Sequence, residues 1–210
     1  KMTALLDRIS VHLPIVEKAF PESHLTELDM ATIVYVEGEF ATDTEGASED
    51  SGIFQVIPST ALWIFQKMSA MPELKATMLE RVGPLPSKDF YELFKTNKRV
   101  QTFAGDAYLG FLKENSSKEL AKRHLENIPR ATFNTIFALS HNKTAVPWEI
   151  LDIYLNDPNT DHTPENISWD KLEPILDQIA NRAPEDRLRY GSFVVDSDSA
   201  KLMKRYAREA

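Results

Sequence analysis

Apolar residues recur every three or four positions along most of this chain, which is the period of an α-helix with one buried face. The pattern predicts helices over residues 25–40, 73–82 and 98–113. Pro58 opens a further helix, since proline is favoured in the first helical turn. The stripe within 98–113 is the most regular one. Its members are Val100, Phe103, Ala104, Ala107, Tyr108, Phe111 and Leu112. We expect this segment to be a core helix.

The second half of the chain has the same helical character. Pro129 and Pro147 open two predicted helices. Two more are expected around residues 172–179 and over residues 200–208, where apolar side chains return at helical spacing.

Few segments favour other structure. The polar stretches 41–51 and 156–168 are predicted loops. Residues 193–195 are three apolar residues that predict a short strand or an extended run. The predicted fold class is therefore mainly α.

Size and composition fit one domain over residues 1–210, because 210 residues bury a core without covalent staples. The chain has no Cys, which excludes disulfides, thiolate nucleophiles and cysteine metal sites. No apolar run approaches the ~20 residues that cross a bilayer, and the first residues contain no signal-like apolar core. We expect no membrane insertion and no signal peptide in this sequence.

The formal net charge is −8, and no basic stripe offsets it. Binding to nucleic acid needs clustered Lys or Arg to neutralise phosphates, so we expect no nucleic-acid partner. Lys1 precedes Met2, which suggests a trimmed chain or a domain cut from a longer polypeptide. With the acidity, this favours a module delivered by a larger assembly.

One pair of motifs points to a function. Glu37 is followed by Gly38-Glu39-Phe40, and eighteen positions after Glu37 comes Gln55, within Gly52-Ile53-Phe54-Gln55-Val56-Ile57-Pro58-Ser59-Thr60-Ala61. This strip resembles the active-site region of soluble lytic transglycosylases and goose-type lysozymes. Those enzymes carry Glu-Ser-x-Phe, a polar loop and Gly-Leu-Met-Gln-x-x-Pro-x-Thr-Ala. Gly38 and Gly46 stand where the family often has serines.

Two later elements extend the resemblance. Phe103-Ala104-Gly105-Asp106-Ala107-Tyr108-Leu109 is similar to the family's Ile-x-Ala-Gly-x-x-Tyr-Leu. Asn142 matches the Asn of Ala-Tyr-Asn-Ala-Gly, with His141 in place of the Tyr and without the Ala-Gly. The resemblance covers about residues 23–155. It implies a lysozyme-like domain of the lytic-transglycosylase type with extra C-terminal helices in 156–210.

The resemblance also implies an activity, which is cleavage of bacterial peptidoglycan at the cell envelope or by a phage particle. Breaking a glycosidic bond needs a proton for the leaving oxygen, and a carboxyl that is buried keeps its proton near neutral pH. Glu37 follows Met30 by seven positions and Ile33 by four, so it lies on their apolar face and is the expected general acid. In a lytic transglycosylase the same residue then acts as base.

The other site residues follow from the resemblance. Gln55, Phe54 and Thr60 would contact or support the glycan, and Asn142 would join them. Tyr108 would orient the helix of Glu37. No metal or cofactor is implied, and no His spacing here predicts zinc.

Two alternatives stay open. A hydrolytic lysozyme normally needs a second carboxylate about 5 to 9 Å away, and Glu49 or Asp50 could supply it. A lysozyme-like domain without turnover could instead bind glycan or serve a structural role. Trp63, Trp148 and Trp169 are expected to fill the core rather than to stack on sugars.

Overall fold

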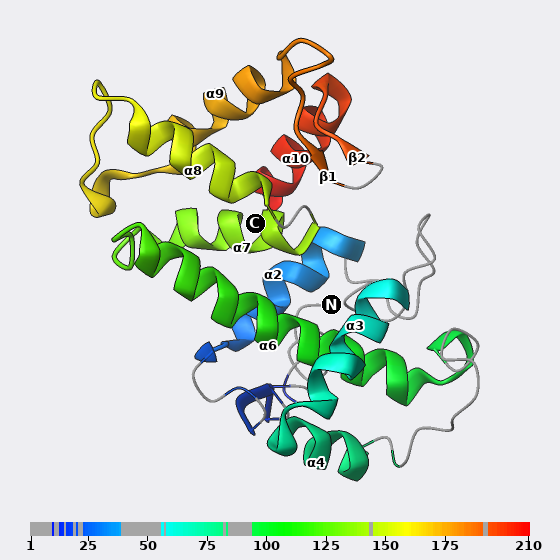
Figure 1. The fold of residues 1–210 in the computed structure, drawn as a ribbon. Helices are drawn as coiled ribbons and strands as arrows, with labels where there is room; N and C mark the ends of the chain where they lie inside the picture. The colour runs from blue at the N-terminus through cyan, green and yellow to red at the C-terminus, as the bar shows by residue number, and fades with distance from the viewer. Residues whose placement is uncertain are drawn as a thin grey trace. The chain divides into compact units, whose positions relative to one another are not determined.

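The computed structural model describes residues 10, 13–14, 16–18, 20, 23–38, 56, 58–81, 83, 94–142, 145–190 and 193–210. The fold is mainly helical, as predicted (Figure 1). The chain divides into two compact units, Lys1–Asn115 and Ser116–Ala210, and the boundary falls inside helix α6 (Lys98–Lys122). A single domain over 1–210 stays a prediction.

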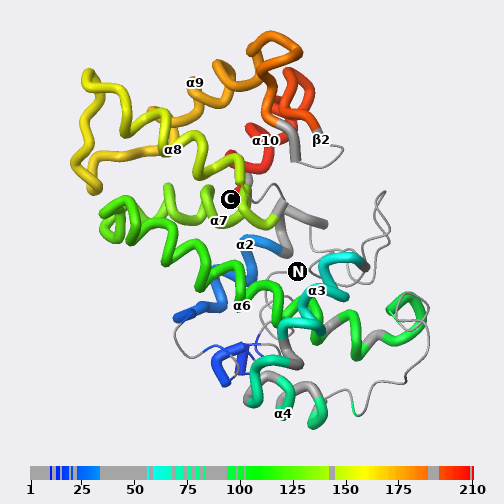
Figure 2. The backbone as a smooth tube through the Cα atoms, viewed as in Figure 1, coloured from blue at the N-terminus to red at the C-terminus, as the bar shows by residue number. Residues whose placement is uncertain are grey.

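The first unit contains helices α2 (Glu27–Gly38), α3 (Pro58–Ser69) and α4 (Pro72–Arg81), together with α6 up to Asn115. Their order along the backbone can be followed in Figure 2. The helix predicted over 25–40 begins two residues later, at Glu27, the one predicted over 73–82 is present as α4, and α3 begins at Pro58 as expected. The core of this unit includes Met30, Ile33, Ile64, Phe103 and Leu109, all buried.

Helix α2 begins with a reciprocal cap. The backbone N–H of Thr26 donates to Asp29 Oδ2 at 2.9 Å, and the N–H of Asp29 donates to Thr26 Oγ1 at 3.2 Å. This arrangement satisfies N–H groups that a helix start leaves without an intrahelical partner. Asp29 is itself fully buried, where Lys113 Nζ lies 3.0 Å from its Oδ2. The start of α2 is thus joined to α6 by a buried ion pair.

This ion pair changes one sequence expectation. Leu28 belongs by spacing to the apolar face of α2, but its exposed fraction is 56%. Its neighbour Asp29 takes the inward position instead. The reason is that a cap and a buried cation stabilise the carboxylate there, which no periodicity argument anticipates.

Helix α6 is longer than predicted, since it continues past residue 113 to Lys122. The apolar stripe is interrupted there by Ser116, which is buried at the position four residues after Leu112 and four before Leu120. A polar contact also supports the end of the helix, because Glu119 pairs at 2.7 Å with Arg123, the residue just after α6.

The second unit contains helices α7 (Arg130–Asn142), α8 (Val146–Asn156), α9 (Trp169–Ala180) and α10 (Ser197–Glu209). Helices α7 and α9 contact each other, and each of them also contacts α8 and α10. A two-stranded antiparallel sheet pairs β1 (Arg189–Tyr190) with β2 (Phe193–Val194). The predicted extended run at 193–195 is therefore a strand, whose partner the sequence did not indicate.

Arg123, just beyond the end of α6, joins α6 to α8 within the second unit. Its Nε and Nη2 atoms donate to the two carboxylate oxygens of Asp152 at 2.7 and 2.9 Å, and its Nη1 donates to Glu119 Oε2 at 2.7 Å. Its guanidinium also lies 5.5 Å from the ring centroid of Trp148. Hydrogen bonding to Asp152 raises the pKa of Arg123. The planar fork of arginine suits this two-oxygen contact, which lysine could not reproduce.

The predicted loop at 156–168 contains one turn of 3-10 helix, η2 (Pro164–Asn166). Its carboxylates are used within the loop. Asp161 accepts hydrogen bonds from the backbone N–H of Thr163 at 3.0 Å and from Asn166 Nδ2 at 2.8 Å. The backbone N–H of Thr163 is the main reason why the pKa of Asp161 falls to about 2. In the part of the chain that the structure describes, no helix is long and apolar enough to cross a membrane.

Candidate functional site

The first unit contains the backbone of three predicted site residues. Glu37 is the last residue but one of α2, Thr60 lies in the first turn of α3, and Tyr108 lies within α6. The side chain of Glu37 is outside the description, and so are Glu49, Asp50, Phe54 and Gln55 altogether. Asn142 is the last residue of α7 in the second unit, and its side chain also lies outside the described residues.

Helices α2 and α3, which carry Glu37 and Thr60, both contact helix α6. On one side the buried Lys113 to Asp29 pair joins it to α2. Two aromatic contacts join it to α3, because Phe103 lies 6.1 Å from Phe65 and Phe111 lies 5.4 Å from Trp63 between ring centroids. The helices of Glu37, Thr60 and Tyr108 therefore belong to one packed group.

The inward face of α2 carries both apolar and polar residues where its side chains are described. Met30 and Ile33 are buried, at 0% and 1% exposure, and Asp29 and Thr32 are buried as well. Met30 and Ile33 are the two residues whose spacing relates them to Glu37. Buried apolar side chains thus lie at the positions that the sequence predicts to adjoin the carboxyl.

The described side chains of the predicted site are accessible. Thr60 and Tyr108 are both half-buried, although each lies on a helix whose other residues form the core. Tyr108 belongs to the apolar stripe of α6, in which Ala104, Ala107 and Leu112 are all buried. The predicted role of Tyr108, which is to orient the helix of Glu37, stays a prediction.

Trp63 contradicts the expectation that all three tryptophans fill the core. Trp148 is buried, but the exposed fraction of Trp63 is 42%. Its ring contacts Phe111 of α6, and Lys67 Nζ lies 5.8 Å from the ring centroid. Sequence reasoning missed this residue because a Trp within an apolar helix gives the same pattern whether it faces inward or outward.

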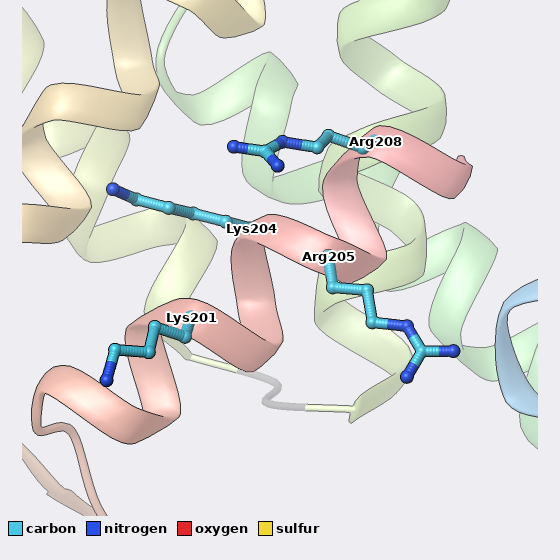
Figure 3. Close-up of a pocket in the computed structure, with 4 residues that line it drawn as sticks. All are labelled: Lys201, Lys204, Arg205 and Arg208. Carbon is cyan, nitrogen blue, oxygen red and sulfur yellow. The ribbon is translucent and has the colours of Figure 1, made fainter.

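The second unit has a basic hollow along α10, lined by Lys201, Lys204, Arg205 and Arg208. Figure 3 shows Lys204 and Arg208 reaching to one side of the helix, whereas Arg205 points away from them. Lys204 Nζ lies 2.6 Å from Asp177, and Arg208 Nη2 lies 4.0 Å from Glu173. Both carboxylates belong to α9. These cations therefore fasten α10 to α9 and do not form an open anion site.

No group of three or more His, Cys, Asp or Glu side chains within the described ranges could hold a metal ion. The segment from Asp157 to Asp161 resembles the start of a calcium loop in its spacing. However, Asp157 Oδ1 accepts hydrogen bonds from the backbone and side chain of Asn159, at 2.9 and 3.0 Å. Its oxygens serve the turn itself.

A comparison with models of protein families, with curated proteins and with solved structures finds no match to this chain. The class that the structure defines is a mainly helical protein in two compact units.

Proposed function

We propose that this protein is a lytic transglycosylase, which cleaves the β-1,4 bond between N-acetylmuramic acid and N-acetylglucosamine in peptidoglycan. The observation that carries the proposal is the packing of the first unit. Helices α2 and α3, which flank the motif strip, are both joined to α6, which carries the third motif element. Segments that the resemblance groups by sequence thus also belong to one packed group of helices.

In this proposal Glu37 has two roles in succession. Its carboxyl first gives a proton to the glycosidic oxygen as the bond from that oxygen to the muramic C1 breaks. The resulting carboxylate then takes the proton of the muramic C6 hydroxyl while that oxygen bonds to C1. The product is a 1,6-anhydro sugar, and no water is consumed. One carboxylate is enough. Helical spacing predicts that Met30 and Ile33, which are buried, are its apolar neighbours and favour its protonated form.

The remaining roles are assigned by resemblance. Gln55 and Phe54 bind the glycan, Thr60 supports the floor of the site, Tyr108 orients the helix of Glu37, and Asn142 contacts substrate. The reaction takes place at the bacterial envelope or during phage infection, with the protein as part of a larger assembly. The hydrolytic alternative would use Glu49 or Asp50, which lie outside the described residues.

The test compares the same change, Glu to Gln, at two nearby positions of the sequence. Glu37→Gln should abolish release of soluble glycan from purified peptidoglycan, because loss of a general acid alone costs about 10²-fold or more. Glu39→Gln is the matched control and should keep the parent rate, since position 39 is predicted to point away from the site. Equal activity of the Glu37→Gln variant and the parent would contradict the proposal.

A further inference from the structure

Helix α3 presents an accessible face that the proposed chemistry uses only at Thr60. Thr60, Trp63 and Lys67 follow one another at spacings of three and four, which places them on one side of the helix. Thr60 is half-buried, whereas Trp63 and Lys67 are exposed. Seven residues of helix rise about 10 Å, so this row offers a hydroxyl, an indole and an ammonium group over about the length of two linked sugar rings.

The indole of Trp63 is held from behind by a row of aromatic rings. Its centroid lies 5.4 Å from that of Phe111, and Phe111 lies 4.7 Å from Phe20 in an edge-to-face contact. Phe20 is buried against Gly110, where an added Cβ would lie 2.2 Å from Phe20 Cδ2. Trp63 is therefore the exposed member of a packed row of aromatic rings. Little of its side-chain freedom remains to be lost when a ligand binds.

The exposed surface suits a sugar better than a protein partner. A stable protein interface covers about 800 Å² on each side, whereas a whole Trp side chain offers only about 150 to 250 Å². The other large apolar side chains that are exposed within the described ranges, Leu28, Leu79 and Leu202, lie on three different helices, α2, α4 and α10. A single flat ring beside polar groups matches the C–H face of a pyranose, whose hydroxyls need polar neighbours.

We infer that Trp63 and Lys67 form a subsite for an acidic amino-sugar strand, in which one sugar ring stacks on the indole and a carboxylate of the strand pairs with Lys67. Lys67 Nζ lies over the indole ring, 5.8 Å from its centroid. Its flexible stem lets the ammonium turn aside when a sugar stacks on the ring, and a carboxylate bound to it would then adjoin that sugar. A muramic acid unit carries a carboxyl group, either free or through its peptide stem, whereas a chitin unit carries none. The identity of the strand as peptidoglycan rests on the proposed function.

The location of α3 supports this assignment. The helix begins at Pro58, three residues after Gln55, which the proposed function places on the substrate. A strand that lies along α3 would pass Thr60 and then Trp63. The cation also matters because the chain as a whole carries a net charge of −8, so an acidic strand needs a local positive group.

The experiment measures binding without turnover, in full-length protein that carries Glu37→Gln. Retention on insoluble peptidoglycan is compared for this parent and for the added changes Trp63→Ala, Trp63→Phe and Lys67→Met. We expect Trp63→Ala to weaken retention about tenfold or more, by analogy with the stacking of bases on aromatic side chains. Trp63→Phe should retain most of the binding, since it keeps an aromatic ring at this position.

A neutral ligand distinguishes the contribution of Trp63 to binding from that of Lys67. With a soluble chitin tetrasaccharide, Trp63→Ala should again lose affinity, whereas Lys67→Met should bind like the parent. On peptidoglycan, Lys67→Met should bind several-fold more weakly at low salt and equally at high salt, since salt screens an exposed ion pair.

Several outcomes would overturn the subsite. The first is that Trp63→Ala is retained as well as the parent, and the second is that the parent binds neither ligand. The third is that the parent is a dimer and Trp63→Ala a monomer, which would make this face an interface between two copies of the chain. Failure of the proposed function looks different. Unmodified protein would then release no glycan, while binding that depends on Trp63 would persist.

Discussion

At the residue scale, the buried pair of Asp29 and Lys113 joins the helix of Glu37 to α6. Its side chains are 0% and 7% exposed, so each charge depends on the other for the solvation that water would give. A buried ion pair adds little over an apolar pair of the same shape, but the loss of one partner is costly. That asymmetry allows a clear test.

Lys113→Met should reduce the free energy of unfolding by about 3 to 5 kcal/mol, because it leaves the Asp29 carboxylate buried without its cation. The measurement is urea unfolding at neutral pH. The double variant Asp29→Asn with Lys113→Met should recover most of this loss, since neither charge is then buried. A single variant as stable as the parent would show that the pair is not formed.

Asp161 gives a pH-dependent prediction. Its pKa of about 2 lies below the ordinary value of 3.8, chiefly because the backbone N–H of Thr163 stabilises the charged form. A lowered pKa contributes stability above about pH 4, and this contribution disappears as the pH falls towards 2. Wild type should therefore exceed Asp161→Asn in stability at pH 5, and the two should converge near pH 2. A constant difference in unfolding midpoint over this range would contradict the assignment.

The pair of Asp29 and Lys113 also shows what could not be predicted from the sequence. The spacing of Thr26 and Asp29 is a recognisable cap signal, but the partner Lys113 lies 84 positions further along the chain. Only the folded structure brings the two charges together. For the same reason the exposure of Leu28 and of Trp63 could not be predicted, since periodicity identifies a face but not what covers it.

At the scale of elements, the sequence predicted which segments are helices better than where they end. Helix α6 continues through a polar segment because Ser116 takes a buried place in the stripe. Helix α10 begins at Ser197, before its apolar stripe starts, because Asp196 Oδ1 accepts a hydrogen bond from the backbone N–H of Ser199 at 2.9 Å. Caps and small buried residues thus set these helix ends.

The end of α6 provides a test of this point. His124 has a φ of 56°, and the following N–H of Leu125 donates to the carbonyl of Leu120 at 3.0 Å, which is the helix-ending arrangement that favours glycine. His124→Gly should stabilise the protein by roughly 0.5 to 1 kcal/mol in urea unfolding. His124→Ala is the control and should give no gain, because it keeps the Cβ. A gain with both would assign the effect to the imidazole instead.

At the scale of the whole molecule, the mainly helical class follows from periodicity alone, whereas the division within α6 does not. An uninterrupted helix gives no sign in sequence that the contacts on its two halves belong to different compact units. The candidate site was likewise predicted only as a set of segments. Its helices pack against α6 through Lys113, Phe103 and Phe111, and none of these contacts is visible as a motif.

The central claim is the route by which the glycan bond is broken, and mass spectrometry of the products tests it most directly. Peptidoglycan digested by the unmodified protein should yield new muramic ends in the 1,6-anhydro form, one water lighter than hydrolysed ends, and Glu37→Gln should yield none. Reducing muramic ends would contradict the transglycosylase mechanism and direct attention to Glu49 and Asp50. Folded protein that releases no muropeptide would contradict the enzyme assignment as a whole.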